Sequence, residues 1–230
     1  MTTYRHSALA SAIVRMWRGW TVIVPVVIVN AVLQALLVRP DATPLIDASA
    51  IVYAVISATV FLVAYGLVGA CALRVSDGRV GWRTAMGILL PNALRYALWA
   101  LGLLLAFSAA LALADALALL LLGLTPFLLL AVLDGQRNPL AANLRTIGRR
   151  FWRWLATALI VGSVVVLGTV VFGVTAFFVR GSAASLLVWL VAGLALAWFT
   201  TAWALIYCNA NAGEDASEPA ADPALEPEPS

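Results

Sequence analysis

Trp154–Phe178, with the sequence WLATALIVGSVVVLGTVVFGVTAFF, is the stretch that decides the fold of this chain. It holds no charged residue and is long enough to cross a hydrocarbon core of about 30 Å as a helix. Backbone N–H and C=O groups find no water in such a core, so a chain crosses it as helices or as a closed barrel. Barrel strands alternate apolar and polar residues, which this stretch does not. It therefore predicts a membrane-spanning α-helix.

Several more apolar runs of this kind occur along the chain. The residues are 63% hydrophobic and 11% charged, with a mean hydropathy of +1.00, whereas a soluble domain carries about 25% charged residues. One helix through the third and fourth runs would be roughly 57 Å long, so we expect a tight hairpin at Asp115 instead. We predict an all-α, polytopic membrane protein whose six transmembrane helices cover Trp20–Val38, Ala50–Leu73, Asn92–Leu113, Ala116–Leu133, Trp154–Phe178 and Ala184–Tyr207.

The orientation follows from the arginines, because positively charged residues collect in cytoplasmic loops. All 14 basic residues are arginine, and twelve of them lie in residues 1–19, 74–95 and 134–153. Only Arg39 and Arg180 lie in the loops on the opposite side. We predict a multi-pass protein of the bacterial plasma membrane with both termini in the cytoplasm. The lysine-free, alanine- and leucine-rich composition is typical of a GC-rich, actinobacterial genome.

Three regions follow from composition: a basic amphipathic segment (1–19), a six-helix membrane domain (20–207) and an acidic tail (208–230). The last eighteen residues contain six acidic residues and four prolines. Such a segment buries too little apolar surface to offset its ordering entropy, so we expect disorder. The tail either stays solvated or lies against the basic cytoplasmic loops.

The membrane domain is predicted to be three pseudo-repeated helix pairs (1–73, 74–133 and 134–207), each introduced by a basic interfacial helix. In the third unit, Asn138 can cap a helix whose first residue is Pro139. One face of this helix is apolar and spans about 60° on a helical wheel; it carries Leu140, Leu144, Ile147 and Phe151. Arginines occupy the opposite face, as expected of a helix lying in the membrane interface.

The N-terminal unit repeats this arrangement, with Leu9, Ile13, Met16 and Trp20 on the apolar face. The middle copy, 79–90, is weakly amphipathic and is expected to end at Pro91. Arginine and tryptophan clusters bind anionic head groups, although such residues also anchor helices at ordinary interfaces. The candidate residues for docking lipid head groups or a partner protein are Arg15, Arg18, Arg145, Arg149, Arg150 and Arg153.

Polar groups inside the spans are costly and therefore informative. Asn30 and Gln34 are four residues apart on one helical face, above Pro25, which can kink the helix. They could line a substrate path, but amides also join neighbouring helices, and we favour a helix–helix contact. Asp115 is interpreted as a turn residue. The glycines interpreted as close-packing positions are Gly66, Gly69, Gly162, Gly168 and Gly173.

Catalytic chemistry has few candidate groups in this sequence. The single histidine is His6, no nucleophile adjoins a base, and the aspartates of the membrane domain are not paired. The two cysteines, Cys71 and Cys208, are isolated and make no metal-binding motif. The sequence contains no phosphate-binding glycine loop and no separate basic domain for nucleic acid. We therefore expect no enzyme activity, no cofactor, no metal and no nucleic-acid partner.

One region resembles a known pattern. Pro126–Gly135 (PFLLLAVLDG), Asn138–Arg145 (NPLAANLR) and Phe151–Arg153 (FWR) place a proline before an aliphatic run, then an acidic turn, a basic amphipathic helix and an aromatic entry to the next span. This is similar to the six-helix membrane domain of some glycerophosphodiester phosphodiesterases and to the related YciC-type bacterial membrane proteins. The resemblance implies a six-helix fold. The phosphodiesterase catalytic domain has no counterpart in this sequence, so its activity is not implied.

In size, composition and topology, the chain is also similar to small accessory subunits of actinobacterial envelope machinery, including the mycobacterial Mce lipid-import complexes. This likeness implies membrane lipids and partner membrane proteins as ligands. Our leading hypothesis is a non-enzymatic accessory or stabilising subunit of a cell-envelope complex that transports lipids. The alternative is a stand-alone transporter of lipids or small molecules, with a cavity near Asn30 and Gln34.

Overall fold

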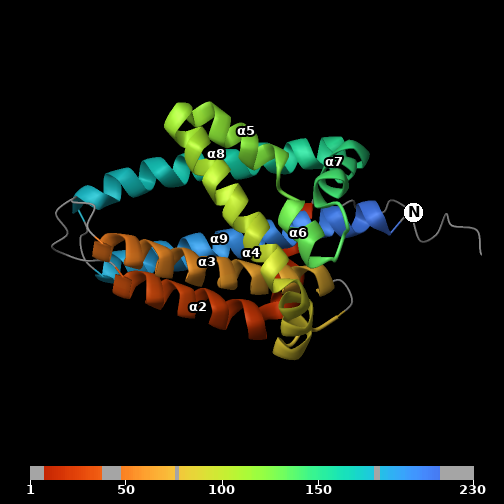
Figure 1. Ribbon diagram of the computed structural model, residues 1–230, viewed down its shortest axis with the longest axis horizontal. Helices are drawn as coiled ribbons and strands as arrows, with labels where there is room; N and C mark the ends of the chain where they lie inside the picture. The colour runs from red at the N-terminus through yellow and green to blue at the C-terminus, as the bar shows by residue number, and fades with distance from the viewer. Residues whose placement is uncertain (1–7, 38–47, 76–77, 179–181, 213–230) are drawn as a thin grey trace, which may run out of the picture.

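The computed structural model consists of helices joined by turns (Figure 1). It describes residues 8–37, 48–75, 78–178 and 182–212. The histidine, the acidic tail beyond residue 212, Arg39 and Arg180 lie outside these ranges. Within them, six helical segments are long and apolar enough to cross a membrane: Leu9–Leu37, Val52–Arg74, Trp82–Leu113, Asp115–Leu133, Phe151–Gly168 and Ala183–Asn211. Over these residues the all-α prediction is confirmed, and so is the prediction of six helices long and apolar enough to cross a membrane.

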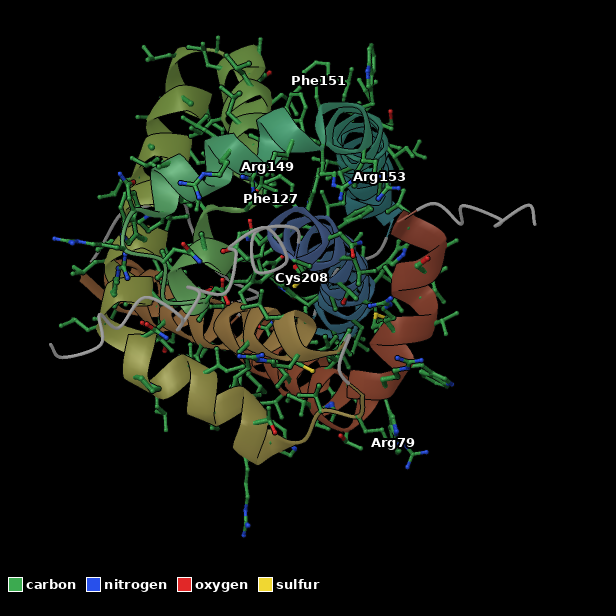
Figure 2. The ribbon with its side chains drawn as sticks, turned by 90° about the vertical axis from the view of Figure 1, so that its right-hand side faces the viewer. Arg79, Phe127, Arg149, Phe151, Arg153 and Cys208 are labelled. Atoms are coloured by element: carbon green, nitrogen blue, oxygen red, sulfur yellow. The ribbon has the colours of Figure 1, made fainter. Side chains whose placement is uncertain are left out.

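The first span begins with a change of direction. Helix α1 (Ala8–Met16) leads through a 3-10 turn, η1 (Trp17–Gly19), into α2 (Trp20–Leu37). In Figure 2, which looks along the bundle, α1 is the red helix that lies across the bundle axis, whereas α2 runs away from the viewer. The carbonyl of Arg18 in the 3-10 turn accepts a hydrogen bond from the backbone of Val80, at 3.4 Å. The loop before α4 therefore holds this corner.

Helices α3 (Ala48–Arg74) and α4 (Trp82–Leu113) approach closely at a glycine. A Cβ atom on Gly66 would come within 2.8 Å of the Leu89 side chain and 3.1 Å of the Tyr96 ring, so any larger residue would force these side chains to shift. One turn later, a Cβ on Gly69 would lie 2.9 Å from Leu133. Both glycines are close-packing positions, as predicted, because small residues let helix backbones approach each other.

The middle interfacial segment is not a separate helix. We expected residues 79–90 to form one that ends at Pro91, but α4 begins at Trp82 and continues through this proline to Leu113. The amide nitrogen of Asn92 donates hydrogen bonds to the carbonyls of Ile88, at 3.1 Å, and Leu133, at 3.2 Å. These bonds hold the helix at the point where proline has no N–H to donate.

The third and fourth spans form the predicted hairpin. Ala114 alone separates α4 from α5 (Asp115–Leu124), and its backbone is extended. A second break, which the sequence analysis did not predict, divides the fourth span into α5 and α6 (Leu128–Leu133). It falls at residues 125–127, where Pro126 cannot donate a backbone hydrogen bond.

The last third of the chain contains one short and two long helices. Helix α7 (Pro139–Arg149) precedes α8 (Phe151–Phe178), and α9 (Ser182–Asn211) ends the described chain. The last span was predicted to end at Tyr207, but α9 continues to Asn211. Asn209 and Ala210 near its end receive hydrogen bonds from Arg150 and Arg149, which explains the extension.

The tightly packed core lies at the end of the bundle that carries η1, the α6–α7 turn and the last turns of α9. We call this the arginine end, because the described arginines flank it. Phe127 is fully buried there, with its ring centroid 5.4 Å from that of Trp203 and 6.5 Å from that of Tyr207. Every residue of α9 from Ala202 to Tyr207 is buried. The ends of several helices thus meet in one apolar cluster.

The opposite half of the molecule is open. In Figure 1, α5 and α8 lie on one side of α2, α3 and α9, and α4 crosses obliquely between the two groups. The prediction of close packing at Gly162 and Gly168 fails within the described chain, where a Cβ atom on either would meet nothing within 4 Å. Gly173 lies where side-chain surroundings are not described. Glycine marks close packing only when another helix follows the same path, and α8 does not follow its neighbours.

Candidate functional site

Helix α7 is the best-defined functional element, and it begins as predicted. The side-chain oxygen of Asn138 accepts a hydrogen bond from the backbone N–H of Ala141, at 3.1 Å, and Pro139 occupies the first helical position. A capping oxygen satisfies one of the free N–H groups of the first turn, and proline there loses no hydrogen bond. Local sequence alone is enough to start this helix.

The side chains of α7 form three faces rather than two. The predicted apolar stripe is largely exposed: Leu140 is 48% exposed, Leu144 60% and Phe151 44%, although Ile147 at its edge is buried. The arginines occupy a second face. A third face, about a third of a turn from the leucines, packs against the bundle and consists of Pro139, Ala142, Asn143 and Thr146. The leucine stripe is therefore free to contact lipid while α7 stays attached to the protein.

The attachment depends on Asn143, which is 1% exposed and reaches the break between α5 and α6. Its amide nitrogen donates to the carbonyl of Leu124, at 2.7 Å, and its amide oxygen accepts from the backbone N–H of Phe127, at 3.0 Å. The indole of Trp154 donates to the carbonyl of Gly123, at 2.7 Å. Helix ends buried in an apolar core need such partners. Side chains of α7 and α8 thus bind the backbone groups that the break in the fourth span leaves without helical partners.

Two of the predicted docking arginines bind this chain itself. Arg150 donates to the carbonyl of Asn209, at 2.8 Å, and Arg149 donates to that of Ala210, at 3.3 Å. Cations stabilise the carboxyl end of a helix because its last carbonyls are unpaired and carry the negative end of the helix dipole. These two guanidinium groups therefore fasten α9 to α7, a role that the sequence analysis missed.

The other predicted docking arginines divide between two regions. On the first span, Arg18 is exposed and Arg15 is half-buried; on the α7–α8 side, Arg145 and Arg153 lie at the surface. Figure 2 shows the labelled Arg149 and Arg153 beside α7 and α8, and Arg79 near the corner at η1, all at the arginine end. The structure thus brings the arginines of separate sequence segments to one end of the bundle.

A set of polar contacts holds the turn between α6 and α7. The hydroxyl of Tyr207 donates to the carboxylate of Asp134, at 2.9 Å, and the side chain of Gln136 donates to the same oxygen, at 3.2 Å. Arg95 of α4 donates to the carbonyls of Gln136 and Arg137. The acidic turn noted in the sequence therefore joins α4, α6 and α9.

The two intramembrane amides behave differently. Gln34 is 3% exposed and binds Ser57 of α3 twice: its oxygen accepts from the hydroxyl, at 2.6 Å, and its nitrogen donates to the carbonyl, at 3.0 Å. This supports the helix–helix contact that we favoured. Asn30 is 6% exposed, and its side-chain oxygen has no hydrogen-bond partner among the described residues. It faces a small cavity between α2, α3 and α9.

The described part of the chain contains no group of three or more histidine, cysteine, aspartate or glutamate residues that could hold a metal ion. The thiol of Cys71 is buried, and that of half-buried Cys208 donates to the carbonyl of Leu73, at 3.7 Å. No protein-family model, curated protein or solved structure matches this chain. The functional argument therefore rests on the arrangement of its own side chains.

Proposed function

We propose that this protein is a non-enzymatic subunit that assembles with partner membrane proteins in the bacterial plasma membrane. One observation carries the proposal: the helices of the open half expose apolar side chains and unfilled glycines around most of their circumference. A membrane helix that completes its packing within its own chain exposes only the side that faces lipid.

Helix α8 gives the clearest example. Its packed stripe includes Trp154, Ala158 and Val161, but Val164, one turn further on, is 38% exposed. Side chains on its other sides are exposed too, including Ile160 at 42%, Val166 at 51% and Leu167 at 64%. At about 100° per residue, Ile160 and Leu167 share one side of the helix, and Val166 lies roughly 100–120° from both. The described helices of this chain leave the stretch uncovered.

Helices α4 and α5 extend the same surface. We define the open face as the exposed apolar residues of the second half of α4, of α5 and of α8, which include Leu98, Leu101, Leu105, Leu113, Leu117, Leu120, Leu159, Ile160, Val166 and Leu167. The glycines within it are Gly102, Gly123, Gly162 and Gly168, and a Cβ atom on any of them would meet no described residue within 4 Å.

These glycines favour a protein partner over lipid alone. Small residues line helix–helix interfaces in membranes because they let two backbones approach closely. In the packed half, a Cβ atom added to Gly66, Gly69 or Gly193 would lie under 3.0 Å from a neighbouring side chain. The glycines of the open face have the space for such a contact but no neighbour among the described residues. A transmembrane helix of another protein fits this space.

The arginine end supports the rest of the proposal. Exposed leucines on α7 and exposed tryptophans on the first span (Trp17, 71%; Trp20, 53%) lie beside arginines, which is the composition of helices that rest on anionic lipid. We infer that α1 and α7 lie in the cytoplasmic interface, with both termini in the cytoplasm. The resemblances described above suggest that the complex handles lipids of the cell envelope.

Site-specific photo-crosslinking tests the proposal in intact cells. A photoreactive residue replaces Leu167 (64% exposed) or Leu105 (63%) on the open face, and Leu36 on α2 (73%) serves as the matched control. We expect Leu167 and Leu105, but not Leu36, to give an adduct with a protein that mass spectrometry identifies. Adducts with lipid only, at all three positions, would contradict the proposal.

A further inference from the structure

The cavity beside Asn30 lies within the most tightly associated group of transmembrane helices. It has a volume of about 20 Å³. Its lining includes Val27 and Asn30 of α2, Phe61 and Tyr65 of α3, and Trp189 of α9. A site needs about 10–15 Å³ by this measure to hold one water. The cavity therefore has room for a single small molecule, and not for a lipid or a metabolite.

Asn30 gives this cavity a polar wall. Its side chain is 6% exposed, and its oxygen has no hydrogen-bond partner within the described ranges. An unpaired amide in an apolar core costs roughly 1–3 kcal/mol by protein mutational data. Gln34, one turn away, has both of its amide atoms bonded to Ser57. The contrast between neighbouring amides of one helix indicates that Asn30 has a partner other than a described side chain of this chain.

Tyr65 supplies a second polar group. It lines the same cavity, and its side chain ends in a hydroxyl group. A tyrosine oxygen can donate one hydrogen bond and still accept another. The cavity thus borders an amide from α2 and a hydroxyl from α3. The other lining residues are apolar except for the indole N–H of Trp189; they include Val26, Ala64, Val68, Gly193, Leu196 and Ala197.

We propose that this cavity binds one structural water, which bridges Asn30 and Tyr65 and so joins α2 to the α3–α9 pair. The lining carries no charged group, and an unpaired cation in a membrane core is costly, so a neutral ligand fits better than a monovalent cation. Water also suits either orientation of the amide, because it donates to an oxygen and accepts from an N–H group. This inference is independent of the proposed function.

A structure of the full chain in lipid, at a resolution that shows single waters, tests the site directly. We expect an ordered, water-sized density within hydrogen-bond distance of the Asn30 side chain. Density from a bound ion would appear with more ligands and with anomalous scattering after exchange for rubidium or thallium, and it would overturn the assignment. An empty cavity would overturn it as well.

Thermal unfolding of Asn30→Leu, in detergent, gives an independent test. If a water satisfies the amide, the substitution removes a hydrogen-bonded bridge, and Tm falls by a few degrees. If the amide is unsatisfied, leucine removes a buried polar group without a partner, and Tm rises. The variant Ala64→Val narrows the same cavity without changing the amide. If the cavity holds a water, Ala64→Val should expel it and lower Tm. If the cavity is dry, the added methyl groups should fill it and raise Tm.

Discussion

Individual polar residues hold this apolar protein together at the points where its helices break or end. Asn143 serves the break between α5 and α6, Gln34 joins α2 to α3, and Tyr207 holds the turn at Asp134. Each places its hydrogen bonds where water is scarce, so each removes a desolvation cost that no apolar residue could remove. Two predictions at this scale follow from the contacts of single side chains.

Replacing Asn143 with alanine should destabilise the protein more than replacing the capping residue Asn138. It leaves the N–H of Phe127 and the carbonyl of Leu124 without their partner, which costs roughly 1–3 kcal/mol for a buried group. Asn138→Ala is the matched control, because it removes one exposed cap bond, at about 1 kcal/mol. Thermal unfolding in detergent measures both. Equal losses would show that the break is not held by Asn143.

The arginines of α7 and α8 should separate into two functional groups. Arg153→Gln should weaken binding to anionic vesicles about fivefold, at about 1 kcal/mol for each arginine near the surface, and should leave Tm unchanged. Arg150→Gln should instead reduce the free energy of unfolding by about 0.3–1 kcal/mol, and so lower Tm, because Arg150 binds the carboxyl end of α9. Vesicle co-flotation and thermal unfolding measure the two effects. Identical behaviour of both variants would refute the division.

At the scale of elements, the surroundings of a glycine differ between helices that pack against a neighbour and helices that do not. A Cβ atom on Gly69 of α3 would come within 2.9 Å of the Leu133 side chain, whereas one on Gly162 of α8 would meet no described residue within 4 Å. Both glycines occur in long apolar helices with similar neighbours in sequence. The α7 helix shows the same principle, since its apolar stripe is exposed and a face of small and polar residues is buried.

Replacing each of these two glycines with valine should affect stability differently at the packed and the exposed position. Gly69→Val should cost about 1–3 kcal/mol, because overpacking displaces the side chain of Leu133. Gly162→Val adds the same atoms in a place with no neighbour, so Tm should stay the same. If the proposed function is right, Gly162→Val should also reduce the amount of partner protein that is crosslinked by a photoreactive residue at position 167. A stable Gly69→Val variant would contradict the close approach of α3 to α6.

At the scale of the whole molecule, packing and charge are both asymmetric along the bundle. The arginine end holds the aromatic core around Phe127 and the polar contacts of the α6–α7 turn, whereas the other half leaves α4, α5 and α8 exposed. The dense end gives the protein its stability, and under the proposed function the open end offers a surface for a second protein. Charge and topology together determine which end faces the cytoplasm.

Reporter fusions test the orientation. Green fluorescent protein fused after residue 230 should fluoresce, and alkaline phosphatase at the same site should be inactive, because the arginine-rich loops direct that end to the cytoplasm. Alkaline phosphatase inserted between residues 38 and 47 should be active, since this loop follows the first span. The reverse pattern would show that the arginine end faces outward.

Much of the fold could be predicted from sequence, since uncharged stretches such as Trp154–Phe178 leave the backbone no choice but a helix in a membrane. The hairpin at Asp115, the cap at Asn138 and the close-packing glycines of α3 also follow from local chemistry. The break at Pro126 did not, because a proline within an apolar run is compatible with both a kinked and an interrupted helix. Its outcome depended on Asn143, which binds both sides of the break from a later helix.

The sequence by itself determined the number of spans, their α-helical form and the arginine asymmetry, because length, hydropathy and charge act locally. Only the tertiary structure decided which side chains have partners within the chain. It showed that Arg149 and Arg150 bind α9, that Gln34 is satisfied while Asn30 faces a cavity, and that the long apolar helix beginning with Phe151 leaves its sides open. Membrane solvation requires a helix to be apolar all round, so the same apolar sequence serves a helix packed on protein and one that awaits a partner.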